Sequence, residues 1–157
     1  MNQQRSGYAV AVTGDRDVVM TRVFDAPREL VFKAHSSCEH LSRWWARGNP
    51  MDCEIDFRPG GRWRIVEHAP EGDHAFRGEY REIVAPERIV QTFEWEGLPG
   101  HIVEDTHVFT EEDGRTTLTT TSVFASTEDR DGMLSSGMEV GAEQSARHLD
   151  ALLATWV

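Results

Sequence analysis

One short segment contains two histidines and two carboxylates, His101, Glu104, Asp105 and His107. Histidine and carboxylate groups are ligands for metals and can act as general acids or bases. If this segment is a β-strand, Glu104 points away from the other three, and the stretch from His101 to His107 spans about 20 Å. One ion cannot bridge that distance. The segment therefore predicts no metal site, and no metal or other cofactor is expected.

Other catalytic chemistry has few candidates. Lys33 is the only lysine, and its expected place on the solvent side of a helix does not suit a Schiff base. The sequence contains no nucleophile elbow, phosphate-binding loop or dinucleotide-binding motif, and Ser135-Ser136-Gly137 is expected to interrupt a helix. We therefore predict no catalytic residue. Acid–base chemistry by a buried glutamate or histidine remains the alternative.

The charge and the cysteines limit the partners and the compartment. With 16 basic and 27 acidic residues, the net charge is −11. This argues against nucleic acid and anionic membrane partners, because phosphates need clustered lysine and arginine. Cys38 and Cys53 are too few for a disulfide scaffold and do not form a metal-binding pair. We expect both to be reduced, in a cytoplasmic protein without a targeting segment or a membrane span.

A series of short strands must position most of these residues. Apolar and polar residues alternate in seven segments, separated by turns rich in glycine and proline, which is typical of an antiparallel meander. The strands are expected at 18–25, 51–57, 62–68, 74–84, 88–96, 102–111 and 115–124. The strand at 101–110 is expected at an exposed edge, where it would pair two copies of the chain in a homodimer.

Helices are expected after the first strand and at the end of the chain. Residues 28–34 suit a helix, and Ser36 with Glu39 has the spacing of a capping box for a second one that carries Leu41, Trp44 and Trp45. Ser126 and Asp129 have the spacing of an N-cap for a third helix, which Gly132 and Gly137 are expected to interrupt. From Met138 to Trp156 the apolar spacing is helical, and the opposite face carries Glu139, Glu143, Arg147 and Asp150.

Together these elements predict one α+β domain over residues 1–157. A curved antiparallel sheet wraps around a long C-terminal helix, and two short helices follow the first strand. Residues 1–16 are expected to be a weakly ordered lead-in or a weak edge strand. A strongly bent sheet that one helix does not fully cover would leave a cavity between the two.

Six segments resemble, in the same order, the activator of heat-shock protein 90 ATPase-like branch of the START-like (SRPBCC, Bet v 1-like) superfamily. The resemblance implies the helix-grip fold with a ligand cavity between sheet and helix. It also implies one of several roles, among them lipid transfer, hormone sensing, polyketide cyclisation and co-chaperone contact in a stress response. Residues 1–17 are too short to be the chaperone-engaging domain of the eukaryotic co-chaperones. The segments are 21–34, 41–45, 58–64, 78–83, 86–90 and 129–141.

The candidate ligand-binding residues combine aromatic faces with polar groups on apolar strand faces. Trp44 and Trp45 are the strongest aromatic candidates, because adjacent residues of a helix cannot face the same core. His107 shares a strand face with Phe109, and we expect it to give the cavity a polar handle; an edge-strand histidine in water is the alternative. Met138 with Gly137 is expected to form a gate. The set is Trp44, Trp45, Trp63, Tyr80, Gln91, Phe93, Trp95, His107, Phe109, Thr120 and Met138, with Ser122 beside Thr120 and ordinary core packing as the alternative for the aromatic members.

Three functions are compatible with this pattern. We expect a non-catalytic protein that binds a small hydrophobic or aromatic molecule. The first alternative is a cyclase/aromatase-like or hydrolase enzyme that uses the same cavity. The second is a protein-interaction module that contacts a chaperone. Fold alone does not decide between them.

Overall fold

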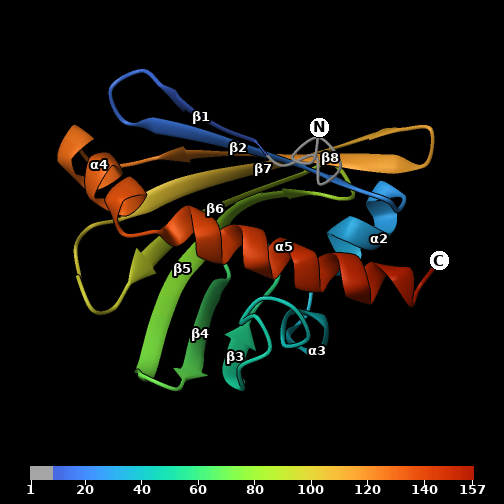
Figure 1. Ribbon diagram of the computed structural model, residues 1–157, viewed down its shortest axis with the longest axis horizontal. Coiled ribbons are helices and arrows are strands. Elements are labelled where there is room, and N and C mark those ends of the chain that lie inside the picture. Colours follow the sequence, from blue (N-terminus) through green and yellow to red (C-terminus); the bar gives the residue numbers. More distant parts are fainter. Residues whose placement is uncertain (1–8) are drawn as a thin grey trace.

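The computed structural model describes residues 9–157. Its strands form one antiparallel sheet in the order β1-β2-β8-β7-β6-β5-β4-β3 (Figure 1). Strand bounds agree with the sequence prediction to within a few residues, because alternating burial defines each strand. The strands are β1 Ala9–Thr13, β2 Asp17–Phe24, β3 Met51–Ile55, β4 Arg62–Ala69, β5 Gly72–Val84, β6 Arg88–Trp95, β7 Val103–Glu112 and β8 Arg115–Val123.

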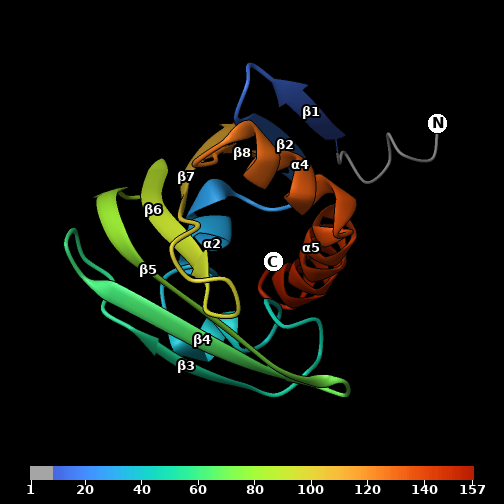
Figure 2. The ribbon, with the colours of Figure 1, turned by 90° about the vertical axis from the view of Figure 1, so that its left-hand side faces the viewer.

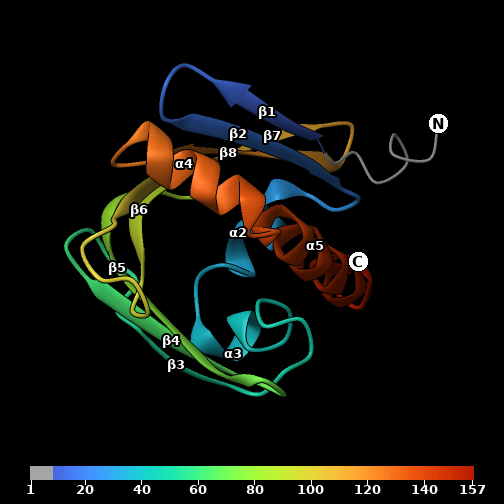
Figure 3. The ribbon, with the colours of Figure 1, turned by 60° about the vertical axis from the view of Figure 1, so that its left-hand side comes forward.

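The sheet is strongly curved. Figures 2 and 3 show it bending from β1 and β2 around to the β3–β4 side, with the long helix α5 lying on the concave side. This is the predicted α+β helix-grip arrangement. The helices are α2 Arg28–Lys33, α3 Cys38–Leu41, α4 Thr127–Ser135 and α5 Met138–Ala154.

The beginning of the chain differs from the prediction in one respect. Ala9–Thr13 is a strand that pairs antiparallel with β2, so part of the expected lead-in is the edge strand that was its alternative. The two short helices consequently follow the second strand. Residues 1–8 of the lead-in lie outside the described residues.

The second short helix has a different cap and a different length. Ser37, not Ser36, is the N-cap, and its side chain accepts a hydrogen bond from the His40 amide at 3.3 Å. The helix ends at Leu41. Trp44 and Trp45 therefore lie in the turns that follow it, where adjacent side chains can point to different sides.

The C-terminal part confirms one predicted cap and corrects a predicted helix face. Ser126 accepts from the Asp129 amide at 3.0 Å, and Gly137 separates α4 from α5 with a φ of 81°, a left-handed conformation that glycine adopts without strain. Glu143 and Asp150 were expected to face solvent. Instead they form ion pairs with Arg22, which points inward from β2.

Two further predictions are wrong. The structure joins Cys38 and Cys53 in a disulfide, with Cα atoms 5.6 Å apart, because α3 packs against the inner face of the edge strand β3. Sequence spacing alone does not show this proximity. Strand β7 is not an edge, since β6 and β8 pair with it on either side. Two copies therefore cannot pair edge to edge through the 101–110 segment, and the edge strands are β1 and β3.

Candidate functional site

A row of polar side chains crosses the inner face of the curved sheet. Gln91 on β6 is paired with Tyr80 on β5 and with Asp105 on β7, and Asp105 is in turn paired with Ser122 on β8. Residues paired in this way point to the same face of an antiparallel sheet. We call these four residues the polar row. It runs through a surface whose other members are mainly aromatic.

Asp105 is the ionisable member with the strongest perturbation. The Ser122 hydroxyl donates a hydrogen bond to one carboxylate oxygen at 2.6 Å. Burial raises the pKa of Asp105 to about 6, against the lowering effect of the Ser122 hydrogen bond, and the nearby Glu104 charge adds to the rise. The carboxylate is thus ionised for the most part at neutral pH, although it has lost much of its water.

Two histidines lie beside the polar row, and both are neutral at pH 7. His107 forms a hydrogen bond through Nδ1 with the Thr120 hydroxyl at 2.8 Å, and burial, together with the charge of His35, lowers its pKa to about 3. His35 bonds through Nδ1 to the Val31 carbonyl at 2.8 Å. Burial lowers its pKa to about 4 despite that bond. The two rings lie 6.2 Å apart.

Several polar groups of the row have no protein partner among the residues that the structure describes. These are the Tyr80 hydroxyl, the Gln91 amide and the second carboxylate oxygen of Asp105. In the same part of the chain, the buried side-chain atoms without a partner are Arg22 Nε and His40 Nδ1. The unpartnered groups of Tyr80, Gln91 and Asp105 are not among these fully buried atoms. Each of them is therefore in contact with space that solvent can reach. Polar atoms in such a place hydrogen-bond to water or to a ligand.

Half-buried aromatic rings stand next to the row. Trp45 packs edge-on against Phe76 with ring centroids 5.3 Å apart, and Phe76 lies 5.3 Å from Phe93. All three keep partial exposure. We call Trp45, Phe76 and Phe93 the aromatic wall. Such rings offer large apolar faces for stacking against a ligand.

Other predicted site residues belong to the core. Trp44 is 7% exposed and donates its indole N–H to the Ala34 carbonyl at 3.0 Å. Trp63 donates to the Thr92 carbonyl at 3.1 Å. Phe109 is 1% exposed. These three rings pack within the fold, as the core-packing alternative expected.

Trp95 and Met138 lie at the surface. They are 43% and 38% exposed, Trp95 at the end of β6 and Met138 at the first residue of α5. Met138 directly follows the break at Gly137, where the sequence predicted a gate. The structure does not bring either side chain into the polar row.

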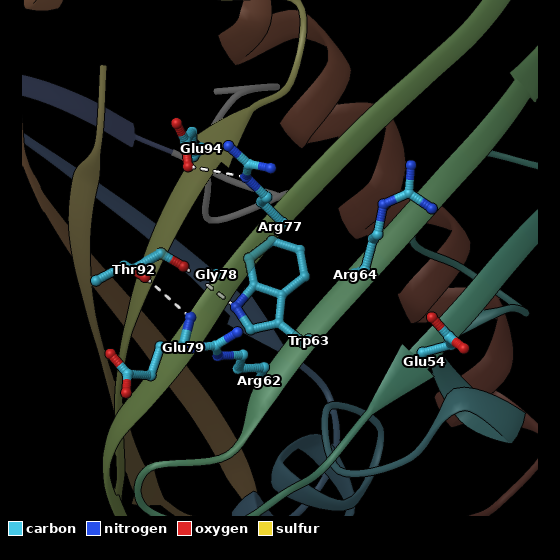
Figure 4. Close-up of a pocket in the computed structure, with 9 residues that line it drawn as sticks. All are labelled: Glu54, Arg62, Trp63, Arg64, Arg77, Gly78, Glu79, Thr92 and Glu94. Carbon is cyan, nitrogen blue, oxygen red and sulfur yellow. Dashed lines mark hydrogen bonds and ion pairs between the residues drawn. The ribbon is translucent and has the colours of Figure 1, made fainter. Parts of the chain in front are cut away.

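One pocket of the structure is lined mainly by charged side chains on the outer face of strands β3 to β6. It has a volume of about 450 Å³, and Figure 4 shows that charged side chains surround Trp63 there. Arg64 is paired with Glu96 at 2.7 Å and Arg77 with Glu94 at 3.0 Å. This charged lining does not suit an apolar ligand. It is not the cavity that was expected between the sheet and α5.

Sequence reasoning undervalued Asp105, Ser122, His35 and Phe76. Asp105 was weighed only as a metal ligand, although it shares its strand face with His107 and Phe109. That shared face was a usable signal. No sequence signal places His35, which follows α2, beside His107 on β7.

Residues 9–157 contain neither a metal-binding cluster nor a membrane-spanning helix. No group of three or more histidine, cysteine, aspartate or glutamate residues in 9–157 is arranged to hold a metal ion. Within the same range, no helix is both long and apolar enough to cross a membrane.

Comparison with known proteins identifies relatives over nearly the whole chain. A family model described as "Activator of Hsp90 ATPase homolog 1-like protein" matches residues 25–154. A crystal structure from Rhodobacter sphaeroides is 29% identical, with a TM-score of 0.85 and coverage of 94% of this chain and 99% of that one. Crystal structures from Mycobacterium smegmatis (26% identity, TM-score 0.84, 95% and 98% coverage) and Chromobacterium violaceum (26%, 0.74, 89% and 98%) are also similar. No curated protein matches the chain.

Proposed function

The chain belongs to the Activator of Hsp90 ATPase homolog 1-like family, and from that premise we propose that it binds a small hydrophobic or aromatic molecule without catalysis. The ligand lies between the concave face of the sheet and α5. The aromatic wall supplies the apolar contact, and Gln91, Asp105 and His107 supply the polar contacts.

The observation that carries this proposal is the set of free hydrogen-bonding groups in the polar row. A protein interior satisfies nearly all of its polar atoms. Here Tyr80, Gln91 and Asp105 have unused groups that face accessible space beside half-buried rings. An apolar surface with a few polar groups pointing into it is the usual composition of a small-molecule site.

The arrangement favours binding over covalent catalysis. Ser122 is the hydroxyl nearest to a carboxylate, but its hydrogen bond goes to Asp105 and not to a histidine. His107 is bonded to Thr120 and His35 to a backbone carbonyl. Nucleophilic catalysis needs a base in contact with the nucleophile, and these histidines do not provide one.

One observation supports an enzyme as the second candidate. The pKa of Asp105 is raised to about 6 by burial, which lies within the range in which a carboxyl group works as a general acid or base near neutral pH. A cyclase-like reaction in the same hollow would use this group. Turnover that is abolished in an Asp105→Asn variant would favour that candidate over simple binding.

The proposal is tested with N-phenyl-1-naphthylamine, an uncharged probe that becomes fluorescent in apolar sites. We expect saturable binding to the purified protein and at least a tenfold loss of affinity for Gln91→Phe, whose ring would fill the hollow. Arg88→Phe is the matched control, because it adds the same ring to the outer face of the same strand. Equal affinity of both variants and the wild type would mean that the probe binds elsewhere, provided that circular dichroism shows both to be folded.

A second experiment concerns His107. His107→Leu removes the two ring nitrogens and leaves an apolar side chain of similar length. If His107 contacts the ligand, the order of affinities across a series of naphthalene derivatives should change. An unchanged order would remove His107 from the site.

A further inference from the structure

Asp105 is a carboxylate without a protein counter-charge. Among the residues that the structure describes, no arginine, lysine or histidine forms an ion pair with it. The inward-facing Arg22 is occupied by Glu143 and Asp150. Arg81 is exposed and lies 3.8 Å from Glu104, whose side chain points to the other face of β7. A partly desolvated charge without a partner is costly, so a bound cation would stabilise it.

Other inward-facing carboxylates are differently placed. Glu67 on β4 is 4% exposed and accepts hydrogen bonds from Arg47 at 2.5 Å and Asn49 at 2.7 Å. Its charge is therefore satisfied within the fold. Asp105, by contrast, accepts one hydrogen bond from Ser122 and has no cationic partner among the described residues.

The geometry around Asp105 suits a donor with more than one N–H. One carboxylate oxygen is fixed by the Ser122 hydroxyl at 2.6 Å, which orients the group and leaves the second oxygen free. Gln91 is paired directly with Asp105 across the sheet, so its amide oxygen can accept a second hydrogen bond. His107, two residues along the strand, is neutral and adds no positive charge that would compete for the carboxylate.

Building on the proposed ligand-binding function, we propose that Asp105 makes the hollow selective for molecules that join an aromatic or apolar body to a protonated amine. The body stacks on the aromatic wall, and the ammonium group donates to Asp105 and Gln91. A charge-assisted hydrogen bond of this kind is stronger than one between neutral groups. An anionic ligand of the same shape is repelled by the carboxylate.

Three ligands of nearly equal size test the proposal on the unaltered protein. They are 1-naphthalenemethylamine, 1-naphthalenemethanol and 1-naphthoic acid, titrated by calorimetry at pH 7.5, where Asp105 carries its charge. We expect the amine to bind at least tenfold more tightly than the alcohol, and the acid to bind most weakly. Because only the ligand changes, this comparison does not depend on the folding of a variant.

A pair of variants then locates the preference. Asp105→Asn should reduce the preference for the amine to less than threefold, chiefly by weakening the binding of the amine. Glu104→Gln is the matched control, since it makes the same chemical change on the outer face of the same strand, and it should keep the full preference. A preference that survives Asp105→Asn would place cation recognition elsewhere and overturn the proposal.

The results separate the two proposals. If the alcohol and the amine bind equally well to the wild type, the hollow binds ligands but Asp105 does not select cations. If none of the three ligands binds, the proposed ligand-binding function itself fails, and the cation selectivity fails with it.

Discussion

Replacing Asp105 with asparagine should stabilise the protein at pH 8 and have a smaller effect at acidic pH. The folded state raises the pKa of this carboxyl from 3.8 to about 6, chiefly by burial. The folded chain therefore binds a proton in a range where the unfolded chain has already released it. Stability from this group is complete below the unfolded pKa, and it is lost as the pH rises through the folded value.

The size of the effect follows from the two pKa values. Complete ionisation of Asp105 corresponds to a loss of about 3 kcal/mol of unfolding free energy. About 1.5 kcal/mol of that loss falls between pH 5 and pH 8, where the rest of the protein is least disturbed. Asparagine has no such dependence, and its carbonyl can still accept the hydrogen bond from Ser122. The stability gap between variant and wild type should therefore widen by about 1.5 kcal/mol over this interval.

Urea denaturation followed by tryptophan fluorescence at pH 5, 6.5 and 8 measures this gap. The titration of His107 and His35 cancels in the comparison, because both proteins contain these residues. Glu104→Gln is the control, and its gap should change less, since the Glu104 carboxylate stays in water in the folded state. A gap for Asp105→Asn that is constant from pH 5 to pH 8 would refute the reasoning that Asp105 is desolvated in the fold.

Further substitutions probe the fold at three places. Gly78→Ala should destabilise the protein by about 2–3 kcal/mol, because the added methyl group would collide with a backbone carbonyl and an indole ring. Gly132→Ala is the control: its added methyl group has no atom within 4 Å, and the substitution should raise the melting temperature slightly. Arg22→Met should cost about 1–3 kcal/mol in urea unfolding, because it removes two ion pairs to α5, while Glu143 keeps its pair with Arg147 and Asp150 is partly exposed; an unchanged midpoint would contradict a stabilising role of these pairs. Cys38→Ser with Cys53→Ser should cost about 3 kcal/mol by freeing a short loop, and a reductant should lower the melting temperature of the wild type only.

The strands could be predicted well because their signal is local. Strand β3 alternates half-buried and exposed residues from Met51 to Ile55, and this period is visible in the sequence. Strand β1 was less clear, since four of its five residues are exposed and only Val10 is half-buried. The disulfide depends on the docking of α3 against β3, which no local pattern reports. Contacts between distant elements were the part that sequence reasoning could not supply.

The same distinction explains the outcome at the candidate site. Strand parity correctly predicted that Gln91, His107 and Thr120 point inward, because it depends only on alternation along each strand. It did not show which inward residues would be covered. Trp44 and Phe109 are buried by neighbouring elements, whereas Trp45 remains partly open. The charged face of α5 was assigned to solvent because the sequence does not show that Arg22 lies opposite Glu143 and Asp150.

The Arg22 ion pairs also tie the long helix to the sheet. Glu143 and Asp150 lie two helical turns apart on one side of α5, and both reach the guanidinium group of β2. Two attachment points on the same helix resist its rotation about its own axis, because a rotation would break both ion pairs. The side of α5 that faces the sheet is thus fixed by charge as well as by apolar packing.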